Sequence, residues 1–424
     1  EFQRLHGMGG DLYAEVLRGH KGRACRVLAP VGNHEDLLPY LVRRLLENGA
    51  NTSFVNRIMD ENLPVEEVAE DPLVKAANTV PAAHPGIPLP VHLYGAERRN
   101  SSGRNLVDEN IVATLALEMQ SFAQGKNQVE PLLAVKSVKS SGNGSFSDND
   151  PSYPDVVVAE VRNTDEAEVD AAIDAASNFA PAWDAVSIDE RAGALDKAAD
   201  LLEQRLPEFM VLCTREAGKT VNDTIAEVRE AVDFLRYYAA RAREQFGSAK
   251  TLHGPTGEHN ELSLHGRGVF VCISPWNFPL AIFMGQVSAA LVAGNTVLAK
   301  PAEQTPLIAY RAVQILHEAG IPRAALQLLP GDGATVGARL TSDPRIAGVA
   351  FTGSTATGRR VAERASKRLI GYSLELGGKN PMIVLEGANL AVVKAQLRKQ
   401  GVKPKKVKKQ TASFGAKKGK KITP

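Results

Sequence analysis

The chain has 424 residues, of which 44% are apolar and 23% charged, a balance typical of globular proteins with two or three domains. Its three cysteines, Cys25, Cys213 and Cys272, lack the spacing of a metal site, which argues against a disulfide framework or a zinc site and favours a cytoplasmic protein. The net charge is +2, but residues 394–424 hold twelve Lys and Arg and no Asp or Glu, so the rest of the chain is acidic.

The first residues, EFQRLHGMGG, lack the pattern of a secretion signal and are typical of the middle of a domain, so we expect a chain truncated at its start. An apolar stretch at 23–32 and a helical pattern from residue 34, with Gly49 just past its end, predict a βα unit. Pro-, Gly- and Ser-rich segments then indicate a connector at 63–150, in which 106–122 could be helical.

Helical periodicity returns in three long blocks, at 165–183, 189–218 and 222–246. Short apolar strands follow at 268–276, 294–302, 324–333 and 346–354, and helical segments such as 306–320 separate them. This alternation predicts a parallel, doubly wound sheet whose ligand crevice lies at the carboxyl ends of the strands.

The most apolar stretch, 278–294, is interrupted by Pro279 and Gln286 and is short for a membrane span. We therefore interpret it as a buried helix. No transmembrane segment is predicted.

Five motifs resemble the aldehyde dehydrogenase superfamily in their order and spacing: ISPWNFPLA, LAKPAEQTP, LLPGDG, FTGS and LELGGKNP. A single glycine turn after a strand would indicate little, but the ordered series is specific. The resemblance implies an oxidoreductase with a Rossmann-like NAD-binding domain. It also implies a thiolate nucleophile, an oxyanion donor and a general base.

Within these motifs, the resemblance assigns the adenosine ribose to Lys300 and Glu303, and a carboxylate there favours NAD because it would repel a 2′-phosphate. A solvated Lys/Glu pair is the alternative interpretation. Gly333 would lie against the adenine. Gly353 and Ser354 would begin a helix whose N-terminal amides bind the pyrophosphate. The alternative is that these residues only cap the helix, and both interpretations can hold together. Ile273 and Trp276 would line the same cleft.

For catalysis, the resemblance assigns the oxyanion donor to Asn277 and the general base to Glu375. The alternatives are an Asn in a turn before a proline and an exposed acid at a strand end. The family's nucleophilic cysteine would fall near Lys409, where the sequence reads VKPKKVKKQTASF. We interpret all three cysteines present as buried, inert thiols, so the nucleophile is absent.

The N-terminal segments EFQRLHGMG and RVLAPVGNHEDLLPYLVRRLLENGANTSFVNRI resemble the end of the (β/α)8 proline dehydrogenase barrel of bifunctional proline-utilisation proteins. The resemblance assigns Arg43 and Arg44 to the proline carboxylate and places Glu47 by the flavin, FAD. Basic residues on a solvated helix face are the alternative. In this family an aromatic residue next to the APVG motif packs on the substrate. The sequence has Leu28 at that position.

The expected α/β organisation is therefore a barrel end at 1–62, a connector at 63–150, an incomplete NAD-binding domain at 151–390 and a basic tail at 391–424. The resemblance to proline utilisation covers about 1–355. The following segment is more similar to succinate-semialdehyde dehydrogenases. The tail resembles part of a pilus-assembly protein, so the chain could be a chimera.

The implied function is NAD-dependent oxidation of glutamate γ-semialdehyde in proline catabolism, with the chain itself inactive. The implied partners are a small semialdehyde and further copies of the parent protein, which could also associate peripherally with a membrane. The alternative is a nucleotide-binding protein whose basic tail binds nucleic acid or an anionic surface. Its one aromatic residue, Phe414, argues against stacking on bases.

Overall fold

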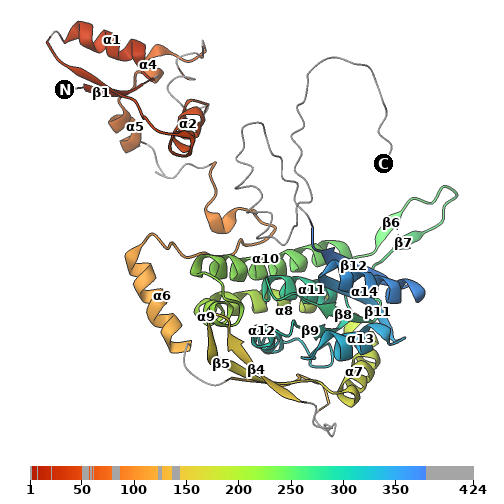
Figure 1. The fold of residues 1–424 in the computed structure, drawn as a ribbon. Coiled ribbons are helices and arrows are strands. Elements are labelled where there is room, and N and C mark those ends of the chain that lie inside the picture. The colour runs from red at the N-terminus through yellow and green to blue at the C-terminus, as the bar shows by residue number, and fades with distance from the viewer. Residues whose placement is uncertain are drawn as a thin grey trace, which may run out of the picture. The chain divides into compact units, whose positions relative to one another are not determined.

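The computed structural model describes residues 2–6, 8–20, 22–49, 57, 60, 62–78, 86–122, 127–135 and 144–378. The chain divides into two compact units, Glu1–Pro88 and Leu89–Pro424 (Figure 1). Part of the expected connector, 63–150, therefore belongs to the second unit. The expected basic tail lies outside the described residues.

The first unit contains two successive βα pairs. Its strands run parallel, with Phe2 opposite Cys25 and Leu5 opposite Leu28. The predicted strand and helix are both present, although the helix includes Gly49 instead of ending before it. The elements of this unit are β1 (Phe2–Leu5), α1 (Gly10–Gly19), β2 (Cys25–Leu28), α2 (His34–Gly49), α4 (Val65–Val68) and α5 (Pro72–Asn78).

The second unit is built on a five-stranded parallel sheet in the order β10-β9-β8-β11-β12. In chain order this is 3-2-1-4-5, so the direction of winding reverses between β8 and β11, as in doubly wound folds. The predicted α/β fold class is confirmed. The strands are β8 (Val269–Ile273), β9 (Thr296–Lys300), β10 (Leu326–Leu328), β11 (Ile346–Gly353) and β12 (Gly371–Leu376).

Helices cover both faces of this sheet. On one face α11 and α12 pack against the strands, and α8, α9 and α10 form a further layer (Figure 1). The other face carries α7, α13 and α14. The bounds are α7 (Glu166–Asp184), α8 (Ile188–Gln204), α9 (Leu206–Ala217), α10 (Val221–Phe246), α11 (Ala281–Val292), α12 (Pro306–Ala319), α13 (Ala338–Ser342) and α14 (Thr355–Lys367).

The helix boundaries follow from local chemistry. The predicted block 189–218 is two helices, because the chain breaks at Arg205 and Pro207 lies in the first turn of α9, where a proline is tolerated. A capping box of Asp165 and Glu168 begins α7. The apolar stretch 278–294 forms α11, whose residues are mostly buried, as predicted. Within the described ranges, no helix combines the length and hydrophobicity that crossing a membrane requires.

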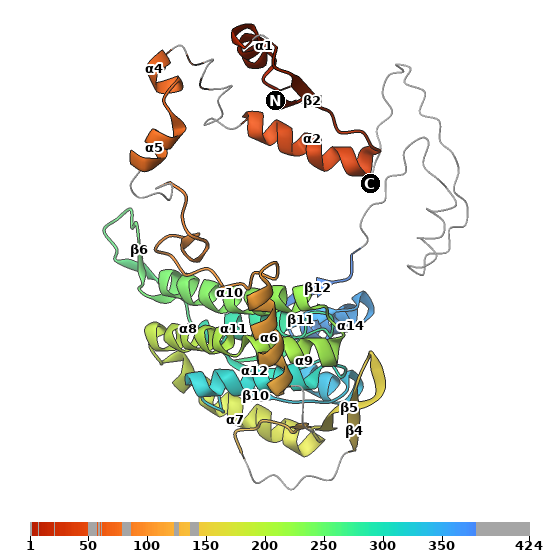
Figure 2. The ribbon, with the colours of Figure 1, turned by 90° about the vertical axis from the view of Figure 1, so that its left-hand side faces the viewer.

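The expected connector contributes regular structure to the second unit. Within it are η1 (Pro90–His92), α6 (Glu109–Phe122), β3 (Asn127–Val129) and β4 (Ser145–Asp150). The helix α6 packs against α9 (Figure 2). The strand β5 (Tyr153–Arg162) pairs with β3 in parallel and with β4 in antiparallel, so a hairpin spans residue 150. A further hairpin, β6 (Lys250–Leu252) and β7 (Asn260–Leu262), projects from the unit (Figure 1).

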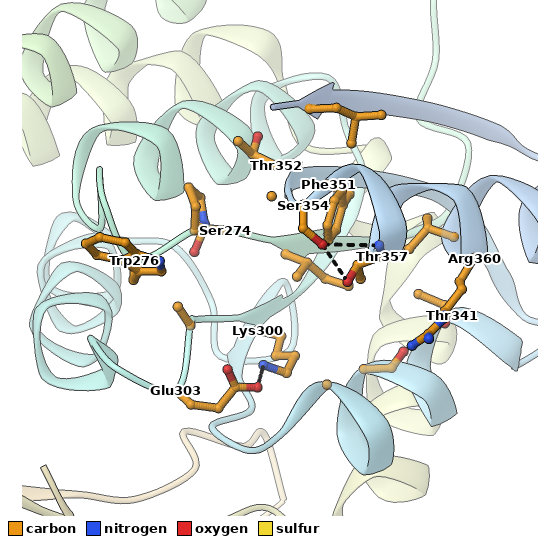
Figure 3. A pocket seen from close by; sticks show the side chains of 18 of the residues that line it. Ser274, Trp276, Lys300, Glu303, Thr341, Phe351, Thr352, Ser354, Thr357 and Arg360 are labelled. Carbon is orange, nitrogen blue, oxygen red and sulfur yellow. Dashed lines mark hydrogen bonds and ion pairs between the residues drawn. The ribbon is translucent and has the colours of Figure 1, made fainter. Parts of the chain in front are cut away.

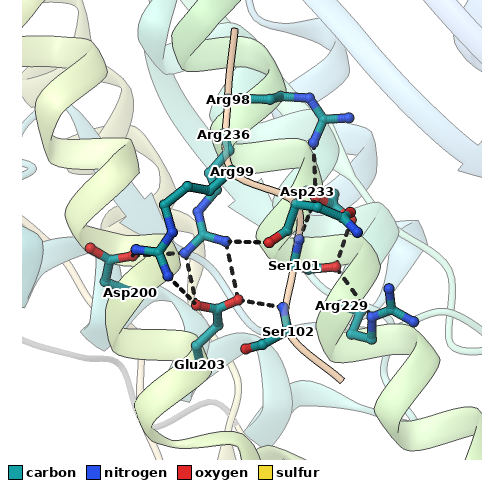
Figure 4. A network of polar contacts seen from close by, with 10 residues as sticks. Arg98, Arg99, Ser101, Ser102, Asp200, Glu203, Arg229, Asp233 and Arg236 are labelled. Carbon is teal, nitrogen blue, oxygen red and sulfur yellow. Dashed lines mark hydrogen bonds and ion pairs between the residues drawn. The ribbon is translucent and has the colours of Figure 1, made fainter. Parts of the chain in front are cut away.

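An irregular segment, residues 98–103, is fastened to α8 and α10, and we call it the strap (Figure 4). Asp233 on α10 accepts hydrogen bonds from Arg98 Nη1 at 2.9 Å and from the Ser101 backbone N–H and hydroxyl at 3.1 and 2.6 Å. Glu203 on α8 accepts the backbone N–H of Ser102 at 2.7 Å. These bonds join residues more than 100 positions apart in the sequence.

Candidate active site

A cavity of about 980 Å³ opens at the carboxyl ends of β8, β9, β11 and β12, where the strand order reverses. Ligands bind at this position in doubly wound folds. All nine residues that we predicted for the cofactor and catalytic sites line it: Ile273, Trp276, Asn277, Lys300, Glu303, Gly333, Gly353, Ser354 and Glu375. The structure therefore brings the whole predicted set together, while the individual roles stay predictions.

Lys300 is the last residue of β9, and its side chain is only 3% exposed. Its ammonium group donates to Glu303 Oε1 at 3.1 Å and to the Pro301 carbonyl at 3.0 Å (Figure 3). Burial lowers the pKa of Lys300, while Glu303 opposes that shift. The pair is thus not the solvated surface pair of the alternative interpretation, and it presents a positioned carboxylate to the cavity.

Gly333 begins η2 (Gly333–Gly337), one turn of π-helix whose N-cap is Asp332. A Cβ atom added at Gly333 would lie 3.9 Å from Glu303 Oε1, with no other atom within 4 Å. A side chain here would therefore enter open cavity space next to the Lys300–Glu303 pair.

The start of α14 faces the cavity. Ser354 is its N-cap, and the hydroxyl accepts the backbone N–H of Thr357 at 3.2 Å (Figure 3). The N-cap interpretation of Ser354 is correct, and it leaves other N–H groups of the first turn available to an anion. Gly353 precedes it, and a Cβ there would lie 2.8 Å from the Phe351 ring, so a larger residue would require a shift.

The two candidate catalytic residues come from different segments. Asn277 lies in the loop between β8 and α11 and is exposed. Glu375 lies on β12, opposite Thr352 of β11, and is also exposed. Both side chains can reach a ligand in the cavity, because both line it.

Some cavity residues were not predicted. Thr357, Arg360, Val361 and Arg364 line it from α14, and their spacing places them on one helix face. The sequence after the FTGS motif shows this spacing, so this helix face could have been predicted from it. Thr341 of α13 lies on the same side of the cavity as Arg360 (Figure 3).

The cysteines of the second unit lie away from the cavity. Cys213 on α9 is 0% exposed and Cys272 on β8 is 1% exposed, and neither lines the cavity. Burial raises the pKa of Cys213 and raises that of Cys272 to about 12, so both stay protonated thiols at neutral pH. The prediction of burial is wrong for Cys25, which is half-buried because little of β2 is covered. Position 409 lies outside the described residues.

The proline-site candidates lie on α2 of the first unit. Arg43 is exposed, and the Arg44 guanidinium lies 5.1 Å from the centre of the Tyr40 ring. The side chain of Glu47 lies outside the described part of the structure. Convergence of the two guanidiniums on one carboxylate stays a prediction.

Comparison with known families divides the chain in the same order. Residues 1–57 match proline dehydrogenase, and residues 138–403 match the aldehyde dehydrogenase family. The second match continues past residue 390, where we expected the basic tail to begin.

Individual relatives support both assignments. Bifunctional protein PutA of Klebsiella aerogenes is 48% identical over 400 residues, which cover 91% of this chain and 29% of that protein. The 1-pyrroline-5-carboxylate dehydrogenase of Bacillus pumilus is 38% identical over 246 residues, covering 57% of this chain and 48% of its own length. The chain thus spans about 29% of the length of the bifunctional relatives.

Two solved structures are similar in fold. Proline utilization A from Bradyrhizobium japonicum has a TM-score of 0.74 and 45% identity, over 89% of this chain and 35% of its own. The 1-pyrroline-5-carboxylate dehydrogenase from Thermus with bound NAD has a TM-score of 0.62 and 32% identity, over 66% of this chain and 55% of its own. A segment that matches proline dehydrogenase precedes the region that matches aldehyde dehydrogenase. The parallel sheet, the cavity at its strand ends and these matches show that the chain belongs to the aldehyde dehydrogenase family.

Proposed function

We propose that the second unit binds NAD in the cavity, as the dinucleotide-binding part of a dehydrogenase that oxidises glutamate γ-semialdehyde to glutamate. The observation that carries this proposal is the buried Lys300 ammonium group paired with Glu303 at the cavity wall. Relatives named 1-pyrroline-5-carboxylate dehydrogenase, one of them solved with NAD, support the substrate and the cofactor.

The cavity residues fit a dinucleotide. Glu303 can accept hydrogen bonds from the ribose hydroxyls, and Lys300 holds that carboxylate in place. Gly333 has no side chain and therefore leaves room for the adenine. The amides at the start of α14 suit the pyrophosphate. When bound, the nicotinamide ring would supply a hydride acceptor.

Asn277 and Glu375 are proposed to act on the substrate. The Asn277 amide can donate to a developing oxyanion without a proton that could be lost. Glu375 can hold a water and take its proton, which is the role of a general base. The thiolate that would attack the aldehyde has no counterpart among the described cavity residues, so we propose that this chain binds NAD without oxidising the aldehyde.

In the longer bifunctional protein, the preceding domain would oxidise proline with FAD, and Arg43 and Arg44 would contact the proline carboxylate. Such a protein would supply the semialdehyde to the second active site.

Calorimetric titration with NAD and NADP tests the cofactor assignment. We expect the wild-type chain to bind NAD about tenfold more tightly, because the Glu303 carboxylate repels a 2′-phosphate. The E303Q variant should lose most of this preference. The control E363Q neutralises an exposed acid of α14 outside the cavity and should keep it. Equal affinity of the wild-type chain for both cofactors would remove Glu303 from the ribose site.

A further inference from the structure

Among the residues that the structure describes, three cationic side chains line the cavity, and they differ in what holds them. Lys300 is paired with Glu303 at 3.1 Å. Arg364 is half-buried and donates to the Thr341 hydroxyl at 2.9 Å. Among the described residues, nothing forms a hydrogen bond or an ion pair with Arg360, although it lines the cavity and is exposed. Arg360 is therefore the cavity cation that is available to a ligand.

The wall that faces α14 is made of small residues. Gly333, Ala334 and Gly337 of η2 and Ala338 of α13 line the cavity on that side, and a Cβ added at Gly337 would lie 3.6 Å from Lys300 Cδ. On the α14 side the Arg364–Thr341 hydrogen bond bridges α14 and α13. Because these residues carry no side chain beyond Cβ, they leave room beside them for a planar ring such as a nucleotide base.

The position of Arg360 along α14 indicates which part of the dinucleotide it meets. Arg360 lies one turn before Arg364 on α14, and the Arg364 guanidinium donates to Thr341 of α13, so both arginines lie on the α13 side of the cavity. Gly333 and the Lys300–Glu303 pair, which suit the adenosine half, lie in the same cavity. Because α13 directly follows η2, which carries Gly333, Arg360 is better placed for the base than for the diphosphate.

We propose that Arg360 stacks its guanidinium plane on the adenine of the bound dinucleotide and thereby sets much of the affinity for the cofactor. This inference rests on the proposed function, because it takes NAD as the ligand. Guanidinium groups stack well on aromatic planes, since they are flat and weakly hydrated. None of the motifs that first indicated an NAD site includes Arg360.

Calorimetric titration of R360A, R360K and R359A tests this proposal, with NAD, AMP and nicotinamide mononucleotide as the probes. Arg359 is the matched control, because it is an exposed arginine on the same helix that does not line the cavity. Unchanged thermal unfolding would show that each variant folds, as expected for exposed positions.

We expect R360A to weaken binding of NAD and AMP by a similar factor, about fivefold, and to leave nicotinamide mononucleotide unaffected. The affinity of R360K for NAD should be closer to that of R360A than to that of the wild type, because lysine lacks the planar group. R359A should bind NAD as tightly as the wild type does. The inference is overturned if R360A binds NAD normally, if R360K restores full affinity, or if AMP binding does not change. A wild-type chain that binds no NAD would instead refute the proposed function.

Discussion

Asp148 and Glu216 form a buried pair of acids that the cofactor site does not use. They are 6% and 3% exposed, and they share a hydrogen bond. Glu216 also accepts the backbone N–H groups of Leu307 and Ile308 at 2.6 and 2.8 Å, where α12 begins. Burial and the neighbouring Asp148 raise the pKa of Glu216 well above its usual range, although these two amides oppose the shift. Burial raises the pKa of Asp148 to about 6.

A pH dependence of stability follows from this raised pKa. Asp148 binds its proton more tightly in the folded chain than in the unfolded chain. This protonation therefore stabilises the fold fully below about pH 4, and the stabilisation is lost as the pH rises through about 6. In D148N the amide stays neutral. The stability of D148N relative to the wild type should therefore increase from pH 4.5 to 7.5, by on the order of 1–3 kcal/mol.

Thermal unfolding of both proteins across this pH range is the measurement. The control is D155N, because Asp155 is an exposed acid on β5. The difference in stability between D155N and the wild type should not change with pH. If the stability difference between D148N and the wild type also stays constant with pH, the pKa of Asp148 is not raised in the folded chain.

At the scale of elements, the strap joins an irregular segment to two helices. Arg236 of α10 donates to Glu203 at 2.8 Å, to Asp200 at 2.7 Å and to the Asn100 carbonyl at 3.4 Å (Figure 4). Half-buried carboxylates of α8 and α10 therefore satisfy backbone groups of a segment that has no strand or helix partner. The path of the chain where it enters the second unit depends on these side chains.

Removal of the Asp233 carboxylate should release the strap. D233A deletes the acceptor for Arg98 and for Ser101, and hydrogen bonds to charged groups contribute about 1.5–3 kcal/mol. Trypsin cleavage after Arg98, Arg99 or Arg104 should therefore accelerate at least about tenfold.

The matched control is D196A, which removes the surface pair of Asp196 with Arg243 and does not touch the strap. Digestion followed by mass spectrometry identifies the cleaved bonds. Equal cleavage rates in D233A and D196A would show that Asp233 does not hold the segment.

At the scale of the whole molecule, the second unit places cofactor-binding and catalytic candidates around one cavity that contains no described cysteine. We expect the purified chain to show no NADH formation with glutamate γ-semialdehyde. Loss of a covalent nucleophile costs about 10⁶-fold in kcat in a serine protease, and direct hydride transfer from an aldehyde hydrate should be similarly slow.

The assay follows NADH absorbance, with a complete proline-utilisation enzyme as the positive control. Turnover near the rate of this control that is lost in C213S or C272S would show that a buried cysteine acts as the nucleophile. Such a result would require one of these thiols to reach the cavity.

The sequence alone determined the parallel sheet and most of the candidate site. Apolar runs that end in KPAE, PGDG and FTGS mark the carboxyl ends of strands, and in a parallel sheet these ends lie on one edge. The strand pattern therefore predicted that these motifs meet, and the resemblance of the motifs to aldehyde dehydrogenases selected Lys300, Gly333 and Ser354, which line one cavity.

Only the tertiary structure decided which polar groups are buried and what they contact. The burial of Lys300, the acid pair of Asp148 and Glu216, and the strap on α8 and α10 depend on contacts between segments far apart in the chain. The exposure of Arg360 to the cavity depends likewise on how α13 and α14 pack. Periodicity reports which side of a helix or strand is apolar, and it carries no information about the partner that covers that side.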